Sequence, residues 1–258
     1  MVHAMTERRR FVLVRGLARA AGHWHDFDLG LRERFPDATI ERHDLAGNGD
    51  QWPRSSPLAI ADMAADLRAR VLAADPRPPW LIAISLGAMV GLTWLSRWPE
   101  DLRGLVTINT SAGGLSSPLR RLQPGGLIET LKTLAERDPV AREQRILALT
   151  TRRFGRDLEL AREHAAMQAR QPIARANVLR QMIAAAGFRV DPRRVPAEHP
   201  AILMLVSQGD RMVDPRCTAA LAQAFAATRI VHPDAGHDLT LDDPRWCTEQ
   251  IAAWLESR

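Results

Sequence analysis

The chain has 258 residues, of which 46% are hydrophobic and 25% are charged. This length and mix are typical of one large α/β domain or two small domains, and they exclude a disordered or collagen-like chain. The net charge is +5, from 35 basic and 30 acidic residues, but no basic block with interleaved aromatic residues accompanies it. Nucleic-acid binding is therefore not expected.

Only two cysteines are present, Cys217 and Cys247. They are too few for a disulfide framework or a four-cysteine zinc site, which favours a reducing, cytoplasmic setting. No run of about 18 apolar residues occurs, so no membrane-spanning helix is expected. The first apolar stretch is interrupted by Arg15, Gly16 and Arg19, so a signal peptide is not expected either.

Short apolar runs alternate with longer periodic segments through much of the chain. Continuous apolar runs separated by helices indicate parallel βαβ units with both faces of the sheet covered. We therefore predict an α/β fold with a mostly parallel, doubly wound sheet. The expected strands lie at 11–14, 38–42, 80–84, 105–108, 201–206 and 229–231, and the expected helices at 57–73, 86–98, 214–226 and 243–256.

The alternation stops between Leu115 and His199. Several segments with helical periodicity follow one another there, with no strand pattern between them. This predicts an all-helical insertion at 115–199 between two parts of one core, 1–114 and 200–258. The insertion has 15 arginines and one lysine against nine acidic residues, a net charge of +7. It is either a solvated helical surface, the simpler interpretation, or a lid that attracts anionic substrates. Its expected helices are 127–136, 140–150, 157–169 and 172–186.

Ser85 lies where an apolar strand runs directly into a helix. Ala83 and Gly87 flank it at minus two and plus two, and a sharp strand-to-helix turn needs small residues at those two places. The free N–H groups of the following helix would face a developing oxyanion. This pattern predicts Ser85 as a nucleophile; the alternative is a serine that only caps the helix.

A serine nucleophile needs a base and a carboxylate that orients the base. His237 follows the last expected strand and comes directly after Gly236, so we predict it as the base rather than a histidine on a surface loop. Asp210 and Asp214 both follow the strand at 201–206. We predict that Asp210 orients His237 and that Asp214, just before Pro215, caps a helix. All these residues follow strands, where open α/β sheets bind ligands.

With serine, aspartate and histidine in this order, the chain resembles the α/β-hydrolases over nearly its whole length. Segment 14–17 resembles the family's His-Gly oxyanion loop, with Arg15 in place of histidine. Segment 44–49 resembles the Asp-x-Pro-Gly-x-Gly loop with Ala46 in place of proline, segment 235–238 resembles the terminal histidine loop, and segment 108–111 is similar to a set of bacterial hydrolases.

The resemblance implies a catalytic triad of Ser85, Asp210 and His237, with an oxyanion hole formed by the backbone N–H groups of Leu17 and Leu86. It also implies that 115–199 is a cap, and that the antiparallel hairpin that often opens this fold is missing or reduced. Arg15 is either a structural residue at the strand end or one that reaches the active site.

The predicted function is hydrolysis of a carboxylic ester or thioester of a small molecule through an acyl-enzyme. The same triad also supports C–C bond hydrolysis, a lyase or an acyltransferase, and a non-enzymatic binding protein is a further alternative. No metal site is predicted, because no carboxylate cluster of matching spacing accompanies His23 and His25. The Gly47–Gly49 segment is too short for a dinucleotide loop, so no cofactor is predicted. A monomer or homodimer is expected.

Overall fold

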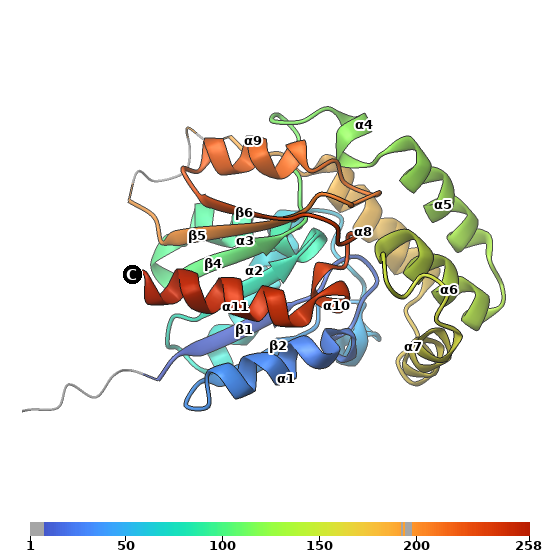
Figure 1. Cartoon of the computed structure of the whole chain (residues 1–258), viewed down its shortest axis with the longest axis horizontal. Helices are drawn as coiled ribbons and strands as arrows, with labels where there is room; N and C mark the ends of the chain where they lie inside the picture. The colour runs from blue at the N-terminus through green and yellow to red at the C-terminus, as the bar shows by residue number, and fades with distance from the viewer. Residues whose placement is uncertain (1–7, 192, 194–197) are drawn as a thin grey trace, which may run out of the picture.

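Six parallel strands form one sheet at the centre of the protein (Figure 1). The computed structural model describes residues 8–191, 193 and 198–258. The strand order is β2-β1-β3-β4-β5-β6, and every pair in the described sheet is parallel. The strands are β1 (Arg10–Val14), β2 (Thr39–His43), β3 (Trp80–Ile84), β4 (Gly104–Ile108), β5 (Ala201–Ser207) and β6 (Thr228–His232).

The strand order reverses between β1 and β3, because the chain leaves β1 toward one edge of the sheet and β3 toward the other. In open α/β sheets the crevice at such a switch point, outside the carboxyl ends of the strands, is where ligands bind. The loops that follow β1 and β3 are therefore the first places to look for a site.

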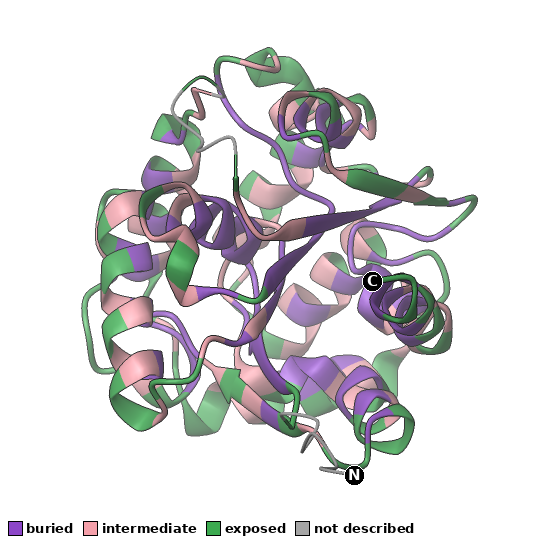
Figure 2. Ribbon diagram, turned by 90° about the vertical axis from the view of Figure 1, so that its left-hand side faces the viewer, coloured by how far each residue is buried: buried purple, intermediate pink, exposed green. Residues whose placement is uncertain are grey.

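Both faces of the sheet are covered by helices, which explains the continuous apolar runs of the strands. Val12 and Val14 of β1 pack toward the α2 and α3 face, while Phe11 and Leu13 pack toward α1 and α11. Figure 2 shows the central strands buried, with one buried side on each flanking helix. The helices are α1 (His25–Arg34), α2 (Ile60–Ala74), α3 (Leu86–Arg97), α9 (Arg216–Ala224), α10 (Leu239–Asp242) and α11 (Pro244–Glu256).

An all-helical insertion follows β4 and precedes β5, as predicted. Its helices lie beyond the carboxyl ends of the strands, on the right in Figure 1, and side chains from them line a cavity together with residues of the core. The limits 115–199 of this cap stay a prediction. The helices are α4 (Pro118–Arg121), α5 (Pro124–Ala135), α6 (Pro139–Thr150), α7 (Leu158–Arg170) and α8 (Arg175–Gly187).

The six expected strands are all present, each within one residue of its predicted ends. Helix α1 was missed, together with the one-turn helices α4 and α10. The apolar residues of α1, Phe27, Leu29 and Leu31, alternate as in a strand, and Gly30 interrupts them. Gly30 serves packing instead: a Cβ there would lie 3.2 Å from Thr248 Oγ1 on α11.

Three 3-10 turns complete the described secondary structure, η1 (Ala21–Trp24), η2 (Gly49–Gln51) and η3 (Pro99–Asp101). Among the residues that the structure describes, none of the helices combines the length and the apolar character needed to cross a bilayer.

Candidate active site

Ser85 occupies a strained turn between β3 and α3. Its backbone angles are φ 56° and ψ −117°, a region that a residue with a side chain adopts at a cost of about 1–3 kcal/mol. Two contacts from the β4 side hold it there. The Ser85 N–H donates to Ile108 O at 2.9 Å, and Thr110 Oγ1 donates to Ser85 O at 2.9 Å. The turn presents the Ser85 side chain at the carboxyl edge of the sheet.

The end of β1 explains why small residues surround this serine. A Cβ on Gly87 would lie 2.5 Å from Arg15 O and 2.6 Å from Val14 O, and a Cβ on Gly16 would lie 3.0 Å from the Ser85 Cβ. The atoms approached are backbone oxygens and a Cβ, which move only if the chain moves. Larger side chains at Gly16 or Gly87 would therefore push β1 away from the turn. The small-residue spacing thus allows the β1 loop and Ser85 to lie in contact.

Three residues predicted from separate segments come together at this turn. His237 Nε2 lies 2.9 Å from Ser85 Oγ, and His237 Nδ1 lies 2.7 Å from Asp210 Oδ2. The other oxygen of Asp210 accepts the backbone N–H groups of Met212 at 2.8 Å and Val213 at 2.9 Å. The carboxylate is therefore fixed by its own loop and still free to accept from the imidazole.

Asp214 lies outside this arrangement. Its carboxylate accepts the Arg216 N–H at 2.9 Å and pairs with the Arg216 guanidinium at 2.5 Å. Helix α9 spans Arg216–Ala224, and Pro215 before it already adopts helical backbone angles, φ −53° and ψ −24°. A side chain that accepts the N–H two residues later, from a position just before the first helical residue, is in the capping arrangement. The contacts therefore agree with the predicted capping role of Asp214.

The electrostatic surroundings favour a basic imidazole. Burial lowers the pKa of His237, but the Asp210 carboxylate opposes this and outweighs it, so the pKa is raised from its ordinary value. A histidine with a raised pKa holds an acquired proton more firmly, which is useful in a group that must take a proton and later return it.

Leu17 lies in the loop after β1, and Leu86 is the first residue of α3 after the Ser85 turn. The Leu86 N–H is at the first position of α3, where no intrahelical acceptor exists. Within the described residues, neither the Leu17 N–H nor the Leu86 N–H donates a backbone hydrogen bond outside regular elements. Two donors therefore remain available beside the Ser85 side chain.

The side chain of Arg15 holds the histidine loop. Its Nη1 donates to Asp238 Oδ1 at 3.1 Å and to Thr240 Oγ1 at 3.0 Å, its Nη2 donates to Asp238 Oδ2, and its guanidinium stacks on Trp24. Burial raises the pKa of Asp238, but Arg15 outweighs this and holds it at about 2. Of the two roles left open for Arg15, the contacts favour the structural one.

Asn109 is a further supporting residue, which sequence reasoning gave no role. It has a left-handed backbone, φ 45°, at the end of β4. Its side chain donates to His237 O at 2.8 Å and to Ser207 Oγ at 2.9 Å. Two sequence signals pointed to it, its position directly after a strand and the resemblance of segment 108–111 to a set of bacterial hydrolases, but neither gave it a role.

A cavity of about 120 Å³ opens onto Ser85 and His237. Its core side is formed by the β1 loop from Arg15 to Arg19 and its cap side by α5, α6 and α8. A larger cavity of about 460 Å³ lies between α2, α3 and the end of α8, but it contains none of the candidate residues. The cap side of the smaller cavity is lined by Thr130, Thr133, Leu134, Ile146, Leu149 and Val178, among others.

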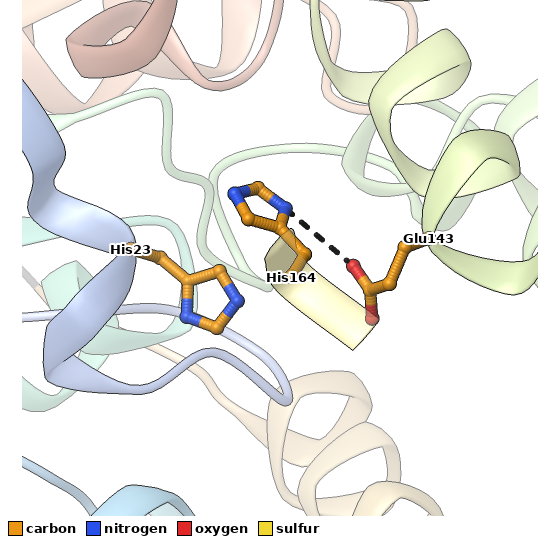
Figure 3. A group of neighbouring side chains, drawn as sticks. All are labelled: His23, Glu143 and His164. Atoms are coloured by element: carbon orange, nitrogen blue, oxygen red, sulfur yellow. Dashed lines mark ion pairs between the residues drawn. The ribbon is translucent and has the colours of Figure 1, made fainter. Parts of the chain in front are cut away.

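A buried polar cluster joins the core to the cap beside this cavity. His23, Glu143 and His164 point toward one another from η1, α6 and α7 (Figure 3), and their ligand atoms all lie within 4.8 Å of one another. The dashed contact in Figure 3, from His164 Nδ1 to Glu143 Oε2, measures 3.7 Å. His25 Nε2 lies 2.8 Å from His164 Nε2. These are residue types that bind zinc.

A guanidinium already lies among these ligand atoms. Arg19 Nη1 is 2.6 Å from Glu143 Oε2 and 3.1 Å from His23 Nε2. Burial raises the pKa of Glu143, but Arg19 outweighs this and holds it at about 2, while burial lowers the pKa of His23 well below its usual range. A metal ion would have to displace Arg19. Spacing along the sequence could not reveal this cluster, because Glu143 comes from the distant cap.

Comparisons with known proteins agree with this architecture. Residues 11–250 match the family model described as the alpha/beta hydrolase family. A search of curated protein sequences gives no match to this chain.

Solved structures with the same fold share little sequence with the chain. An enol-lactonase from Burkholderia xenovorans has a TM-score of 0.77 at 14% identity, covering 96% of this chain and 92% of that one. An esterase from Thermogutta terrifontis has a TM-score of 0.74 at 20% identity, with coverages of 96% and 90%. A hydrolase from Pseudomonas aeruginosa has a TM-score of 0.76 at 17% identity, with coverages of 97% and 91%. Because the family model covers nearly the whole chain, the chain belongs to the α/β-hydrolase family.

Proposed function

We propose that the chain is a serine hydrolase that cleaves a carboxylic ester or thioester of a small molecule. The observation that carries this proposal is the continuous contact from Asp210 through His237 to Ser85, with distances of 2.7 Å and 2.9 Å. The strained backbone of Ser85 and the raised pKa of His237 support it, because both are typical of an activated nucleophile and its base.

In this mechanism Ser85 Oγ attacks the carbonyl carbon while His237 Nε2 takes the hydroxyl proton. The carbonyl oxygen becomes an oxyanion, which the N–H groups of Leu17 and Leu86 stabilise. Collapse of the tetrahedral intermediate breaks the bond to the leaving group, which takes the proton from His237. Asp210 keeps Nδ1 protonated and stabilises the imidazolium.

A second half-reaction then releases the acyl group. Water enters where the leaving group departed and attacks the acyl-enzyme carbonyl, while His237 Nε2 takes a proton from it. The second tetrahedral intermediate collapses to the free acid, and His237 returns the proton to Ser85 Oγ. Attack by an alcohol, thiol or amine in place of water would make the same site an acyltransferase, and analysis of the products separates these outcomes.

The cap at 115–199 selects the substrate in this proposal. Cavities for drug-sized ligands measure about 300–1,000 Å³, whereas this one measures about 120 Å³, so the substrate is small. Its cap side is mostly aliphatic, which suits a short hydrocarbon segment. We propose a monomer or homodimer in the cytoplasm, where the buried, unpaired Cys217 and Cys247 would stay reduced.

Covalent labelling with a fluorophosphonate tests the proposal directly. We expect the label on Ser85 by peptide mapping, no label in Ser85→Ala, and strongly reduced labelling in His237→Ala. Hydrolysis of short-chain esters by the same preparations would follow the same order. A folded wild-type protein that neither takes the label nor cleaves any ester would contradict the proposal.

A further inference from the structure

Two arginines line the catalytic cavity, Arg15 and Arg19, but their donor groups are used differently. Both terminal nitrogens of Arg15 are bound to Asp238, and its Nε is buried. Within the described part of the chain, the side chain of Arg19 has hydrogen bonds at Nη1 alone, to Glu143 and to His23. One guanidinium is thus occupied by the protein, and the other is held by a single nitrogen.

The remaining nitrogens of Arg19, Nε and Nη2, donate to no protein atom among the described residues. They are also absent from the buried side-chain atoms that lack a partner, a group that does include Arg15 Nε. Both nitrogens therefore touch accessible space, and the Arg19 side chain keeps 10% of its surface exposed. The cavity that Arg19 lines is the one that opens onto Ser85 and His237.

These two nitrogens form one edge of the guanidinium, with parallel N–H groups that match the two oxygens of a carboxylate. The protein itself contains an example of this arrangement. Arg10 donates from Nε to Glu41 Oε1 at 2.6 Å and from Nη2 to Glu41 Oε2 at 2.8 Å. The same edge of Arg19 has no such partner among the residues that the structure describes.

The polar groups on the cap side of the cavity do not compete for this role. The hydroxyl groups of Thr130, Thr133 and Thr150 each donate to a backbone carbonyl four residues earlier in their own helix. Glu143 fixes the orientation of Arg19 through Nη1 at 2.6 Å. Asp238 also lines this cavity, but its carboxylate is already paired with Arg15. Arg19 is therefore an oriented cation with a free edge at the border of an otherwise mostly apolar cavity.

We propose that Arg19 forms an anion subsite of the catalytic cavity, and that the substrate is a small ester or thioester with a carboxylate a few bonds from the cleaved carbonyl. This inference rests on the proposed function of Ser85. The net charge of +7 on segment 115–199 attracts such anions toward the cavity. Arg19 is a specificity-determining residue in this proposal and takes no part in bond breaking.

Two ester pairs of matched shape test the subsite. Monomethyl glutarate is compared with methyl 5-methylhexanoate, which tests a charge on the acid side. Acetylglycolate is compared with isobutyl acetate, which tests a charge on the alcohol side. The readout is the ratio of kcat/KM for the anionic ester to that for its neutral partner. We expect the wild type to prefer the anionic member of at least one pair.

Two variants at the same ion pair should affect this ratio differently. Arg19→Gln removes the cation, so we expect the ratio to fall roughly 10- to 100-fold, the value of a charged hydrogen bond. Glu143→Gln removes the competing carboxylate and leaves the cation, so we expect the ratio to stay or rise. A purely structural role for the pair would lower kcat/KM for both esters alike in both variants.

Folding is controlled separately, because Arg19→Gln leaves Glu143 buried without its partner. The double variant Arg19→Gln/Glu143→Gln removes both charges and is expected to fold like the wild type and to show the same loss of anion preference. Its thermal unfolding is measured beside its kinetics, so that a change in the ratio is assigned to a folded protein.

Binding to Ser85→Ala separates failure of the subsite from failure of the proposed function. By calorimetry we expect monomethyl glutarate or acetylglycolate to bind this variant more tightly than its neutral partner, and the difference to vanish when Arg19→Gln is added. Esters cleaved with an unchanged ratio, or equal binding of both members of each pair, would overturn the subsite. An unlabelled Ser85 with no ester cleaved would overturn the proposed hydrolase, and the calorimetry would still decide the subsite.

Discussion

The Ser85 site and the Arg19 cluster lie at the same cavity but are built in different ways. Ser85, Asp210 and His237 follow β3, β5 and β6 of one sheet, so the sheet places them at one edge, and the contacts of Asn109 and Arg15 hold the histidine loop there. Arg19 and His23 belong to the core, whereas Glu143 and His164 belong to the cap. The groups proposed for chemistry are thus at the edge of the sheet, and the groups proposed for selection are at the junction of core and cap.

The largest expected effect belongs to the sheet-built site, by which we mean Ser85, Asp210 and His237. Ser85→Ala removes the nucleophile, so we expect kcat to fall by about 10⁴-fold or more for the best ester found. Thermal unfolding should change little, since alanine keeps the Cβ and loses only the hydroxyl, whose contact is with His237. Activity near that of the wild type in a protein free of contaminating esterase would remove Ser85 from the mechanism.

A pair of aspartate variants probes the same site more finely. Asp210→Asn should lower kcat by about 10³- to 10⁴-fold, because the amide no longer fixes the Nδ1–H tautomer of His237. Asp214→Asn is the matched control, and we expect less than about a threefold change, because Asp214 contacts Arg216 and not His237. A greater loss in the control would reverse the assignment.

This difference between the regions also decides what the sequence could predict. Ser85, Asp210 and His237 each leave a local signature, a strand end followed by small residues, so they could be found one at a time. Glu143 and His164 have no such signature, since they occur at helical spacing among other polar residues of the cap. Their approach to Arg19 depends on how the cap packs on the core, which no pattern in the cap itself encodes.

Acid should lower the stability of the wild type more than that of a variant in which the Arg19–Glu143 pair carries no charge. The pKa of Glu143 is about 2 in the folded protein and about 4.3 in an unfolded chain. A carboxyl with a lowered pKa contributes stability above its unfolded pKa, and that contribution is lost as the pH falls from about 4 toward 2. We expect about 3 kcal/mol to be lost over this range.

The double variant Arg19→Gln/Glu143→Gln is the control for this effect, because it has no charge to titrate at the pair. Urea unfolding at several pH values compares the two proteins. Other carboxylates, including Asp238 with a pKa of about 2, contribute to both curves and cancel in the difference. Parallel curves for wild type and double variant would show that the Arg19–Glu143 pair does not stabilise the fold.

The pH dependence of turnover concerns the sheet-built site alone. His237 must be neutral to accept the Ser85 proton, and its pKa is raised by Asp210. Activity should therefore rise with pH along a limb centred above about 6.5, the ordinary histidine value. Glu143→Gln should leave the centre of this limb in place, because Glu143 is not among the groups that shift His237. A limb centred well below 6.5 would contradict the arrangement.

The smallest effect is expected from metal ions. In the wild type the Arg19 guanidinium lies between Glu143 and His23, so neither a chelator nor added Zn²⁺ should change the melting temperature. Arg19→Gln vacates that position and leaves His23, Glu143 and His164 facing one another. Zn²⁺ should then stabilise this variant, by about 2.7 kcal/mol at a concentration of 100 times its Kd. Stabilisation of the wild type by Zn²⁺, lost in His164→Ala, would instead make the cluster a metal site and Arg19 a displaceable occupant of it.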